Sequence, residues 1–211
     1  MFESIGAVYD IIADDYAARF SDAQLGRPVD IALLDVFTGL VSRRGGTVLD
    51  LGCGPGTVTA LLAKSGLDVI GVDASSQMVR IAEERLPGID FRVGDFRALD
   101  VDDESVAGVC SWYSIVHTEP AALPAVIAEF ARVMLSGAWL LLAFQTEAPD
   151  RTLAEPFGKP VTLTYLRHET GRVSRAMAKV GLAVDSVTIR QRDIDTGETA
   201  NQAFILGRKV G

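Results

Sequence analysis

The chain has 211 residues, with 20 Lys and Arg against 28 Asp and Glu, and a formal net charge of −8. An acidic chain without a local basic stripe is poorly suited to a phosphate backbone, so we expect no nucleic-acid partner. Apolar residues make up 48% of the chain, enough for a sizeable core. Two cysteines, Cys53 and Cys110, are too few for a disulfide framework or a four-cysteine zinc site.

Nothing in the sequence indicates a membrane or secretory segment. No stretch approaches the roughly 18 apolar residues of a membrane span. The first 20 residues carry four acids, unlike a signal peptide. Scarce cysteines favour a reducing compartment. We therefore expect a cytoplasmic protein, a monomer or homodimer, that contacts no membrane and binds no metal, since no local cluster of His, Cys and acids has ligand spacing.

Two hydrophobic periods alternate along the first two thirds of the chain. Helical spacing predicts helices with apolar faces at 33–41, 58–62, 78–86 and 123–134, the last with Pro120 in its first turn. Short apolar runs predict strands at 48–51, 69–72, 91–93, 106–112 and 139–144. Continuous apolar strands alternating with amphipathic helices indicate a parallel sheet covered on both faces.

The alternation ends after residue 144. Residues 146–162 contain three prolines and mixed charges, which predicts an irregular segment. A helix with its apolar face at 173–180 follows, and then strands at 184–190 and 200–207 without a helix between them. Such strands form a hairpin, so the last strand runs antiparallel. The predicted fold class is α/β, a doubly wound, mostly parallel seven-stranded sheet with an antiparallel last strand.

The strongest chemical signal is the sequence VLDLGCGPGT at 48–57, a strand that turns through Gly52, Gly54 and Gly56 into a helix. Glycine allows positive φ and close approach of a ligand to the backbone. In a doubly wound sheet, ligands bind outside the carboxyl ends of the strands. The dinucleotide fingerprint G-x-G-x-x-G needs its third glycine at position 57, which is Thr57. This disfavours a nicotinamide-dependent oxidoreductase; a tight turn without ligand is a further alternative.

Three acids stand in register with this turn. Asp50, inside the first strand, suits a ligand ammonium better than a pyrophosphate. Asp73 closes the second strand, where a carboxylate can accept hydrogen bonds from a ribose diol. Asp95, beside Phe96 at the end of the third strand, suits the exocyclic amine and the ring of an adenine. Met78 could cover the other face of that ring with a polarizable side chain.

The segment from Val48 to Phe144 resembles the core of the class I S-adenosylmethionine-dependent methyltransferases of the small-molecule type. VLDLGCGPG resembles their first motif, Val69 to Ser75 their second-strand acid, and Gly94-Asp95-Phe96 their adenine-side motif. The resemblance implies a Rossmann-like fold, S-adenosyl-L-methionine as cofactor, and a glycine turn that passes under its methionine portion. The cofactor-binding residues predicted in this way are Tyr9, Tyr16, Asp50, Gly52, Cys53, Gly54, Gly56, Asp73, Ala74, Met78, Gly94, Asp95, Phe96 and Ser111.

The N-terminal sequence YDIIADDY, from Tyr9 to Tyr16, resembles the lid of these enzymes, in which paired tyrosines seven residues apart close over the cofactor. Helical spacing places Tyr9, Ala13 and Tyr16 on one face. A packed amphipathic helix is the alternative. We expect one domain over residues 1–211, with a helical cap at 1–45, a cofactor-binding core at 46–145, a substrate lid at 146–165, and a helix and strand hairpin at 166–211.

The segment beyond the fourth strand is where the resemblance places the methyl acceptor. His117 is the candidate catalytic base, because its pKa range suits that role; the alternative is a helix-start residue that binds backbone. Tyr113 either binds substrate or packs, and Trp112 and Phe157 suggest an apolar acceptor. His168 lies among charged residues and is expected to be solvated.

The sequence therefore predicts a methyltransferase that aligns a small-molecule oxygen or nitrogen with an activated methyl group for in-line displacement. The acceptor itself is not identified. A non-catalytic protein of the same fold that binds S-adenosylmethionine or S-adenosylhomocysteine is the alternative, and an NAD-dependent oxidoreductase is a weaker one.

Overall fold

The computed structural model describes residues 4–20 and 27–211. Within these ranges no helix is both long and apolar enough to cross a membrane. The elements in chain order are α1 (Ile5–Arg19), α2 (Pro28–Ser42), β1 (Thr47–Leu51), α3 (Thr57–Lys64), β2 (Asp68–Asp73), α4 (Ser76–Arg85), β3 (Asp90–Val93), β4 (Val106–Trp112), η2 (Ile115–His117), α5 (Leu123–Val133), β5 (Met134–Thr146), β6 (Arg151–Ala154), η3 (Pro156–Gly158), β7 (Thr162–Tyr165), α6 (Thr170–Lys179), β8 (Leu182–Arg190), η4 (Ile194–Thr196) and β9 (Asn201–Lys209).

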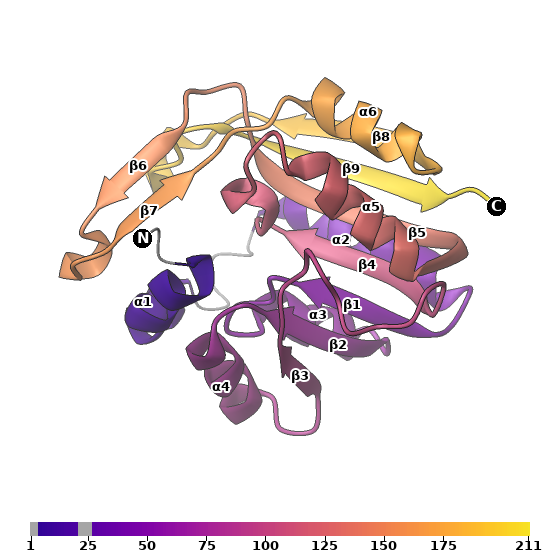
Figure 1. Cartoon of the computed structure of the whole chain (residues 1–211), viewed down its shortest axis with the longest axis horizontal. Coiled ribbons are helices and arrows are strands. Elements are labelled where there is room, and N and C mark those ends of the chain that lie inside the picture. Colours follow the sequence, from indigo (N-terminus) through magenta and orange to yellow (C-terminus); the bar gives the residue numbers. More distant parts are fainter. Residues whose placement is uncertain (1–3, 21–26) are drawn as a thin grey trace.

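One sheet organises the fold (Figure 1). Its strand order is β3-β2-β1-β4-β5-β9-β8. The strands from β3 to β5 pair in parallel, and β9 is antiparallel to both β5 and β8. This confirms the predicted seven-stranded sheet with an antiparallel last strand. The carboxyl ends of the parallel strands share one edge, which faces α1 and the hairpin of β6 and β7 on the left of Figure 1.

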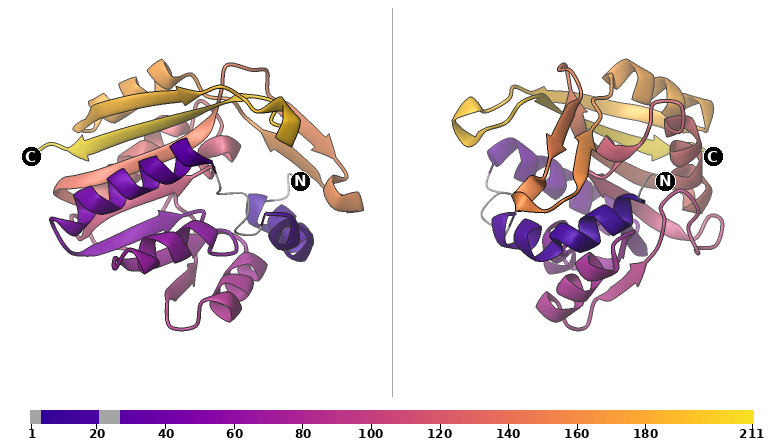
Figure 2. Two further views of the ribbon diagram at one scale, coloured as in Figure 1. Left: turned by 180° about the vertical axis from the view of Figure 1, so that it is seen from behind. Right: turned by 60° about the vertical axis from the view of Figure 1, so that its left-hand side comes forward.

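Alternate residues of the central strands face two separate apolar layers (Figure 2). Val48 packs in the layer of α2 and α3, with Phe37 and Leu62 among its neighbours. Leu49 packs in the layer of α5 and α6, which includes Phe130. Burial on both faces explains why these strands read as continuous apolar runs.

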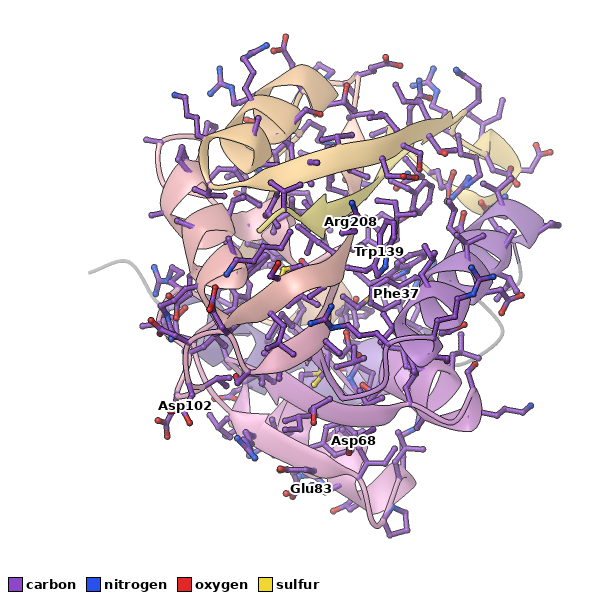
Figure 3. All side chains as sticks on the ribbon, turned by 90° about the vertical axis from the view of Figure 1, so that its right-hand side faces the viewer. Phe37, Asp68, Glu83, Asp102, Trp139 and Arg208 are labelled. Carbon is purple, nitrogen blue, oxygen red and sulfur yellow. The ribbon has the colours of Figure 1, made fainter. Side chains whose placement is uncertain are left out.

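The amino-terminal edge of the sheet carries no feature of the predicted site. Figure 3 views the molecule from this side, where Phe37 of α2 lies beside Trp139 of β5. The Arg208 guanidinium of β9 stands 5.9 Å from the centre of the Trp139 ring, a cation–π distance that stabilises the antiparallel pair.

The prediction of an irregular segment at 146–162 is wrong. β6 pairs with β7 in an antiparallel hairpin separate from the main sheet. The prolines do not prevent this, because Pro149 precedes β6 while Pro156 and Pro160 lie in the turn. No ladder hydrogen bond is therefore lost. The hairpin leaves the carboxyl edge of the sheet and extends over α1 (Figures 1 and 2).

Two local expectations around the fifth helix also need correction. Pro120 lies in the turn before α5, and Pro124 occupies the first turn of that helix. Met134, predicted on the helix, has extended backbone angles and begins β5. The strand starts this early because its pairing with β4 continues across an irregularity between Val106 and Gly108.

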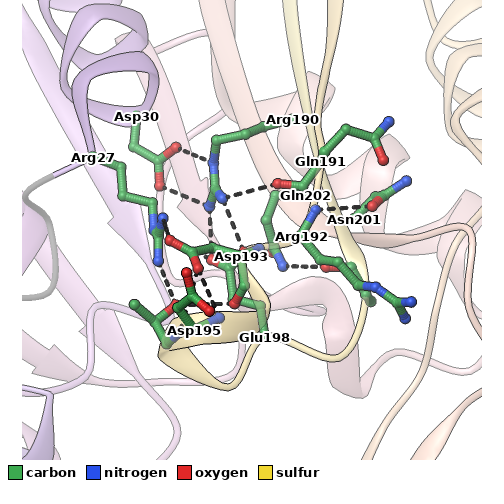
Figure 4. Close-up of polar contacts among 12 residues, drawn as sticks. Arg27, Asp30, Arg190, Gln191, Arg192, Asp193, Asp195, Glu198, Asn201 and Gln202 are labelled. Carbon is green, nitrogen blue, oxygen red and sulfur yellow. Dashed lines mark hydrogen bonds and ion pairs between the residues drawn. The ribbon is translucent and has the colours of Figure 1, made fainter.

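A half-buried ion network joins the start of α2 to the connection between β8 and β9 (Figure 4). The Arg190 guanidinium donates to Asp30 at 2.9 Å and to both carboxylate oxygens of Glu198 at 2.9 Å. The side chains of Arg190 and Asp30 are only 13% and 7% exposed. Burial raises the pKa of Asp30 against the opposing effect of Arg190. One guanidinium thus pairs with two carboxylates that have little access to water, and Arg27 supplies a second positive charge 3.5 Å from Glu198.

Replacing Arg190 with Met should lower the free energy of unfolding by about 3 kcal/mol, because removal of one partner leaves poorly hydrated charges uncompensated. Arg192→Met is the matched control, since Arg192 lies exposed on the same connection and should change stability by less than about 0.5 kcal/mol. Urea unfolding measures both. Equal effects of the two substitutions would contradict a role for the network in stability.

Candidate cofactor and acceptor site

The turn between β1 and α3 contains three glycines with positive φ, at 73° for Gly52, 53° for Gly54 and 82° for Gly56. A Cβ on Gly52 would collide with Ser114, and one on Gly56 would lie 2.9 Å from Cδ1 of Leu86. At Gly54, by contrast, no atom lies within 4 Å of the Cβ position. Packing therefore requires the outer two glycines, whereas the middle one leaves space above bare backbone.

Cys53 lies between these glycines and is buried. Its backbone N–H donates to the Val72 carbonyl at 3.1 Å. Burial raises the pKa of its thiol well above the ordinary value, so the thiol stays protonated and is a poor nucleophile. In the described parts of the chain no three His, Cys, Asp or Glu side chains gather as a metal site.

Asp73 closes β2 beside the turn. Its Oδ2 accepts a hydrogen bond from the Gly54 N–H at 2.8 Å, and its Oδ1 accepts one from the Ser75 N–H at 2.8 Å. Burial raises the pKa of Asp73, and these two hydrogen bonds oppose that shift. Each oxygen retains a lone pair for a ligand hydroxyl, because a carboxylate offers about four acceptor positions.

Asp50 lies deeper, 1% exposed, on the α3 face of β1. Its Oδ2 accepts the Thr59 hydroxyl at 2.6 Å, while its Oδ1 is buried with no hydrogen-bond partner. Burial raises the pKa of Asp50 to about 7 in spite of the Thr59 hydrogen bond. A nearby ligand cation would favour the ionised form and satisfy the free oxygen.

The third predicted acid is already engaged. The Arg97 guanidinium binds both oxygens of Asp95, from Nε at 2.9 and 2.8 Å, and this pairing lowers the pKa of Asp95. The Phe96 ring packs edge-to-face on Phe130 with 5.8 Å between centroids. The Gly94 N–H donates to the Asp73 carbonyl at 2.9 Å, which ties this segment to the end of β2. Contact of Asp95 and Phe96 with an adenine stays a prediction.

Helix α1 lies across the same edge, held at the N-terminus of α4. Oδ1 of Asp10 accepts from the Ser75 hydroxyl at 2.7 Å and from the Gln77 N–H at 3.0 Å. A helix N-terminus favours a carboxylate. The first turn of α1 also contacts the backbone of Ala74. Gly6 permits this second contact, because a Cβ at Gly6 would collide with the Ala74 carbonyl. Ala74 is thus partly covered by the first turn of α1.

Tyr9, Ala13 and Tyr16 share one face of α1, as helical spacing predicts. The two tyrosine rings meet edge-to-face with 5.5 Å between centroids. They pack with Ala13 over Met78 and Ile81 of α4. Because this packing buries Met78, a contact between its sulfur and an adenine stays a prediction.

His117 joins three sequence-distant segments. Its Nδ1 lies 2.8 Å from the Thr164 carbonyl oxygen, and its Nε2 lies 2.9 Å from the Tyr9 hydroxyl. Since a carbonyl only accepts, Nδ1 carries the proton and Nε2 accepts from the tyrosine. Burial lowers the pKa of His117 to about 4. It is therefore a neutral imidazole with its basic nitrogen directed at Tyr9.

The end of β4 is packed rather than open. Ser111 is buried, with its hydroxyl 2.5 Å from that of Ser114. The Trp112 ring packs on Phe204, with 5.3 Å between centroids. Tyr113 has φ of 58°, an uncommon conformation outside glycine. Burial raises the pKa of its phenol.

Phe157, the remaining predicted substrate contact, lies in η3 at the tip of the hairpin and is 38% exposed. Its φ of 57° matches the strained turn there. A role for Phe157, Trp112 and Tyr113 in substrate binding stays a prediction.

The expectation that His168 is solvated is wrong, because the side chain is only 2% exposed. Its Nε2 lies 3.0 Å from the Ile115 carbonyl oxygen, and its backbone N–H donates to Gln145 at 3.1 Å. Its ring also packs against Phe144, with 6.1 Å between centroids. The charged neighbours in sequence suggested exposure, but the chain here runs along β5 and η2, which local sequence does not reveal.

Residues 48–137 match the sequence family described as "Methyltransferase domain". The chain is 31% identical, over its full length, to an uncharacterised 37.1 kDa transposon protein of Streptomyces fradiae, of which it covers 62%. It is 30% identical, over 72% of its length, to a demethylmenaquinone methyltransferase of Renibacterium salmoninarum, of which it covers 64%. These matches are consistent with a class I S-adenosylmethionine-dependent methyltransferase, the family that the sequence resembles. It spans less than two thirds of either of these two relatives.

Solved structures show the same methyltransferase fold. Magnesium protoporphyrin IX methyltransferase of Synechocystis, with bound S-adenosylmethionine, has a TM-score of 0.71 at 17% identity, over 99% of this chain and 98% of that one. Geranyl diphosphate C-methyltransferase of Streptomyces coelicolor, with S-adenosylhomocysteine, has a TM-score of 0.68 at 16% identity, over 89% and 88%. These neighbours contain S-adenosylmethionine or S-adenosylhomocysteine, which supports S-adenosyl-L-methionine as the cofactor. The free oxygen of Asp50 and the open backbone at Gly54 fit its ammonium and its methionine portion.

We predict that Gly54→Ala weakens binding of S-adenosylhomocysteine at least tenfold, because a methyl group would enter the space above the turn. Gly66→Ala is the matched control, since Gly66 also has positive φ and an unobstructed Cβ position but lies at the end of α3. Both substitutions should cost about 1 kcal/mol of stability. Isothermal titration calorimetry measures the affinities; equal affinities for the two variants would place the cofactor elsewhere.

Proposed function

We propose that this methyltransferase moves the methyl group of S-adenosylmethionine to an oxygen or nitrogen of a small-molecule acceptor by in-line displacement. The observation that carries the proposal is the position of His117, bonded to Tyr9 at 2.9 Å. His117 follows Ser114, the residue that touches Gly52 of the cofactor turn. Demethylmenaquinone, geranyl diphosphate and magnesium protoporphyrin, named for the relatives and neighbours, support a small-molecule acceptor.

Three residues would hold the cofactor. Bound S-adenosylmethionine supplies a methyl group already activated by the positive sulfonium. Asp73 would accept its ribose hydroxyls, Gly54 permits close approach of its methionine portion, and Asp50 offers a free oxygen to its ammonium. Holding both reactants in line is the main contribution required of the protein, because alignment alone supplies effective molarities of roughly 10⁵ M or more.

Helix α1 and the hairpin of β6 and β7, which meet over the carboxyl edge of the sheet, would exclude water from the site. Val8 and Ile12 of α1 form an apolar cluster with Val161 and Leu163 of the hairpin. Lys159 of the hairpin pairs with Asp15 of α1 at 3.3 Å. We therefore assign α1 and the hairpin as two lids of one functional domain, with the core of residues 46–145 beneath them.

Tyr9 and His117 would remove the proton that the acceptor loses on methylation. When a hydroxyl or amine is methylated, its proton must leave. The Tyr9 oxygen can take that proton while Tyr9 passes its own to Nε2 of His117. The resulting imidazolium keeps its bond from Nδ1 to Thr164. Because burial lowers the pKa of His117 to about 4, it starts neutral at pH 7 and its imidazolium readily loses the proton again.

The same hydrogen bond favours one alternative, a protein that binds the cofactor without transferring methyl. Nε2 of His117 is already occupied by Tyr9, as a purely structural histidine would be. Tight cofactor binding without formation of S-adenosylhomocysteine, across a broad set of hydroxyl and amine acceptors, would support this alternative.

Binding of S-adenosylhomocysteine at pH 6.5 should release about half a proton or more from Asp50. Its pKa of about 7 leaves the free carboxyl largely protonated, and the ligand ammonium would lower that pKa. Calorimetry in two buffers of different ionisation enthalpy measures the release. Asp50→Asn should abolish the buffer dependence. Identical heats for the wild type in both buffers would show that no ammonium approaches Asp50.

With an acceptor found by screening, Tyr9→Phe and His117→Ala should each lower kcat about 10²-fold or more, as loss of a general base does. Tyr16→Phe is the control, because it keeps the ring that is predicted to cover the cofactor and removes only a hydroxyl that does not touch His117. Its kcat should stay within about threefold of the wild type. Rate losses below about threefold in Tyr9→Phe and His117→Ala would leave both residues structural.

A further inference from the structure

Two arginines of the hairpin region, Arg151 and Arg167, have no assigned role. Arg151 stands opposite Tyr165 in the pairing of β6 with β7, and Arg167 follows Tyr165 by two residues. Their guanidinium groups converge on one atom, Oγ1 of Thr199. It lies 3.4 Å from Nη1 of Arg151 and 2.9 Å from Nη2 of Arg167.

In the described parts of the chain, no carboxylate makes a direct ion pair with either of these two cations. Among residues 4–20 and 27–211, neither guanidinium has a carboxylate oxygen within 4.0 Å. Asp150 lies nearby but accepts from the backbone N–H of Arg167 at 2.8 Å. Other arginines, such as Arg97 and Arg190, do bind carboxylates. An acidic chain that leaves two adjacent guanidinium groups without a directly bound carboxylate keeps a site suited to an anion.

The geometry of Arg167 strengthens this argument. Its Nη1 donates to the Tyr165 carbonyl at 2.8 Å, so the guanidinium is fixed in place. Its Nε–H is buried and has no hydrogen-bond partner. A buried donor without an acceptor is costly. An oxyanion bound beside Arg167 would satisfy it.

The cluster also adjoins the proposed transfer site. The Tyr165 ring lies 5.2 Å from the His117 ring, centre to centre, and His117 contacts Tyr9. A molecule held by the two arginines would therefore reach past Tyr165 toward the Tyr9–His117 pair.

We propose that Arg151 and Arg167 bind an oxyanion group, a carboxylate or a phosphate, on the methyl acceptor. The inference rests on the proposed function and narrows its acceptor to anionic small molecules. Guanidinium groups match both oxyanions because their N–H donors form a planar fork. The Thr199 hydroxyl, now between the two guanidinium groups, donates to the same oxyanion.

The test titrates benzoate and, separately, phenyl phosphate into the protein with and without saturating S-adenosylhomocysteine, followed by ligand-observed NMR. At least one probe should bind the wild type with millimolar affinity or better, and the two arms distinguish carboxylate from phosphate. Arg151→Gln and Arg167→Gln should each weaken that binding about tenfold. Arg192→Gln, which removes the same charge from an exposed position on the Thr199 connection, should leave it unchanged.

Two results would overturn the inference: neither probe binds the wild type, or either hairpin variant keeps full affinity. Affinity for S-adenosylhomocysteine should be the same in all variants, which shows that each is folded. Failure of the wild type to bind S-adenosylhomocysteine would instead contradict the proposed function, and the titrations without it would still report on the anion site.

Discussion

Close packing around the three glycines of the turn between β1 and α3 determines how the rest of the site is built. Gly52 touches Ser114, which begins the segment beyond β4, while Gly56 touches Leu86 at the end of α4. Any side chain at either glycine would move one of these neighbours. Both contacts fix the backbone between them, so the Gly54 N–H reaches Asp73 at 2.8 Å. The proposed recognition of the cofactor and the position of His117 therefore depend on the same short stretch of backbone.

The covering of the site depends on contacts between segments that lie far apart in the chain. α1 is held to α4 through Asp10, and it meets the hairpin through Tyr9, His117 and the Thr164 carbonyl. None of these hydrogen bonds is exceptional alone. Together they join the first helix, the end of β4 and the hairpin over one edge of the sheet, where excluding water strengthens every polar interaction.

The sheet and the cofactor turn were predictable because their signals are local. Strand and helix periods, the GCGPG turn and the acid that closes β2 are all contained in short windows of sequence. The hairpin is not evident from the sequence, because three prolines and mixed charges indicate an irregular segment, although the prolines lie outside the ladder. The burial of His168 and the Tyr9–His117 hydrogen bond, between residues 108 apart, were not predictable, because long-range packing decides them. The convergence of Arg151 and Arg167 on Thr199 was likewise not predictable, because it depends on how β6 pairs with β7 and on where the connection between β8 and β9 lies.

The most direct test of the account is thermal unfolding with S-adenosylmethionine, S-adenosylhomocysteine and NAD in parallel. A ligand at about 100 times its Kd stabilises the folded state by roughly 2.7 kcal/mol, which raises Tm by about 5–10 °C for a chain of this length. We expect such a rise with S-adenosylmethionine and with S-adenosylhomocysteine, and none with NAD. A rise with NAD alone, or no rise with S-adenosylhomocysteine, would contradict it.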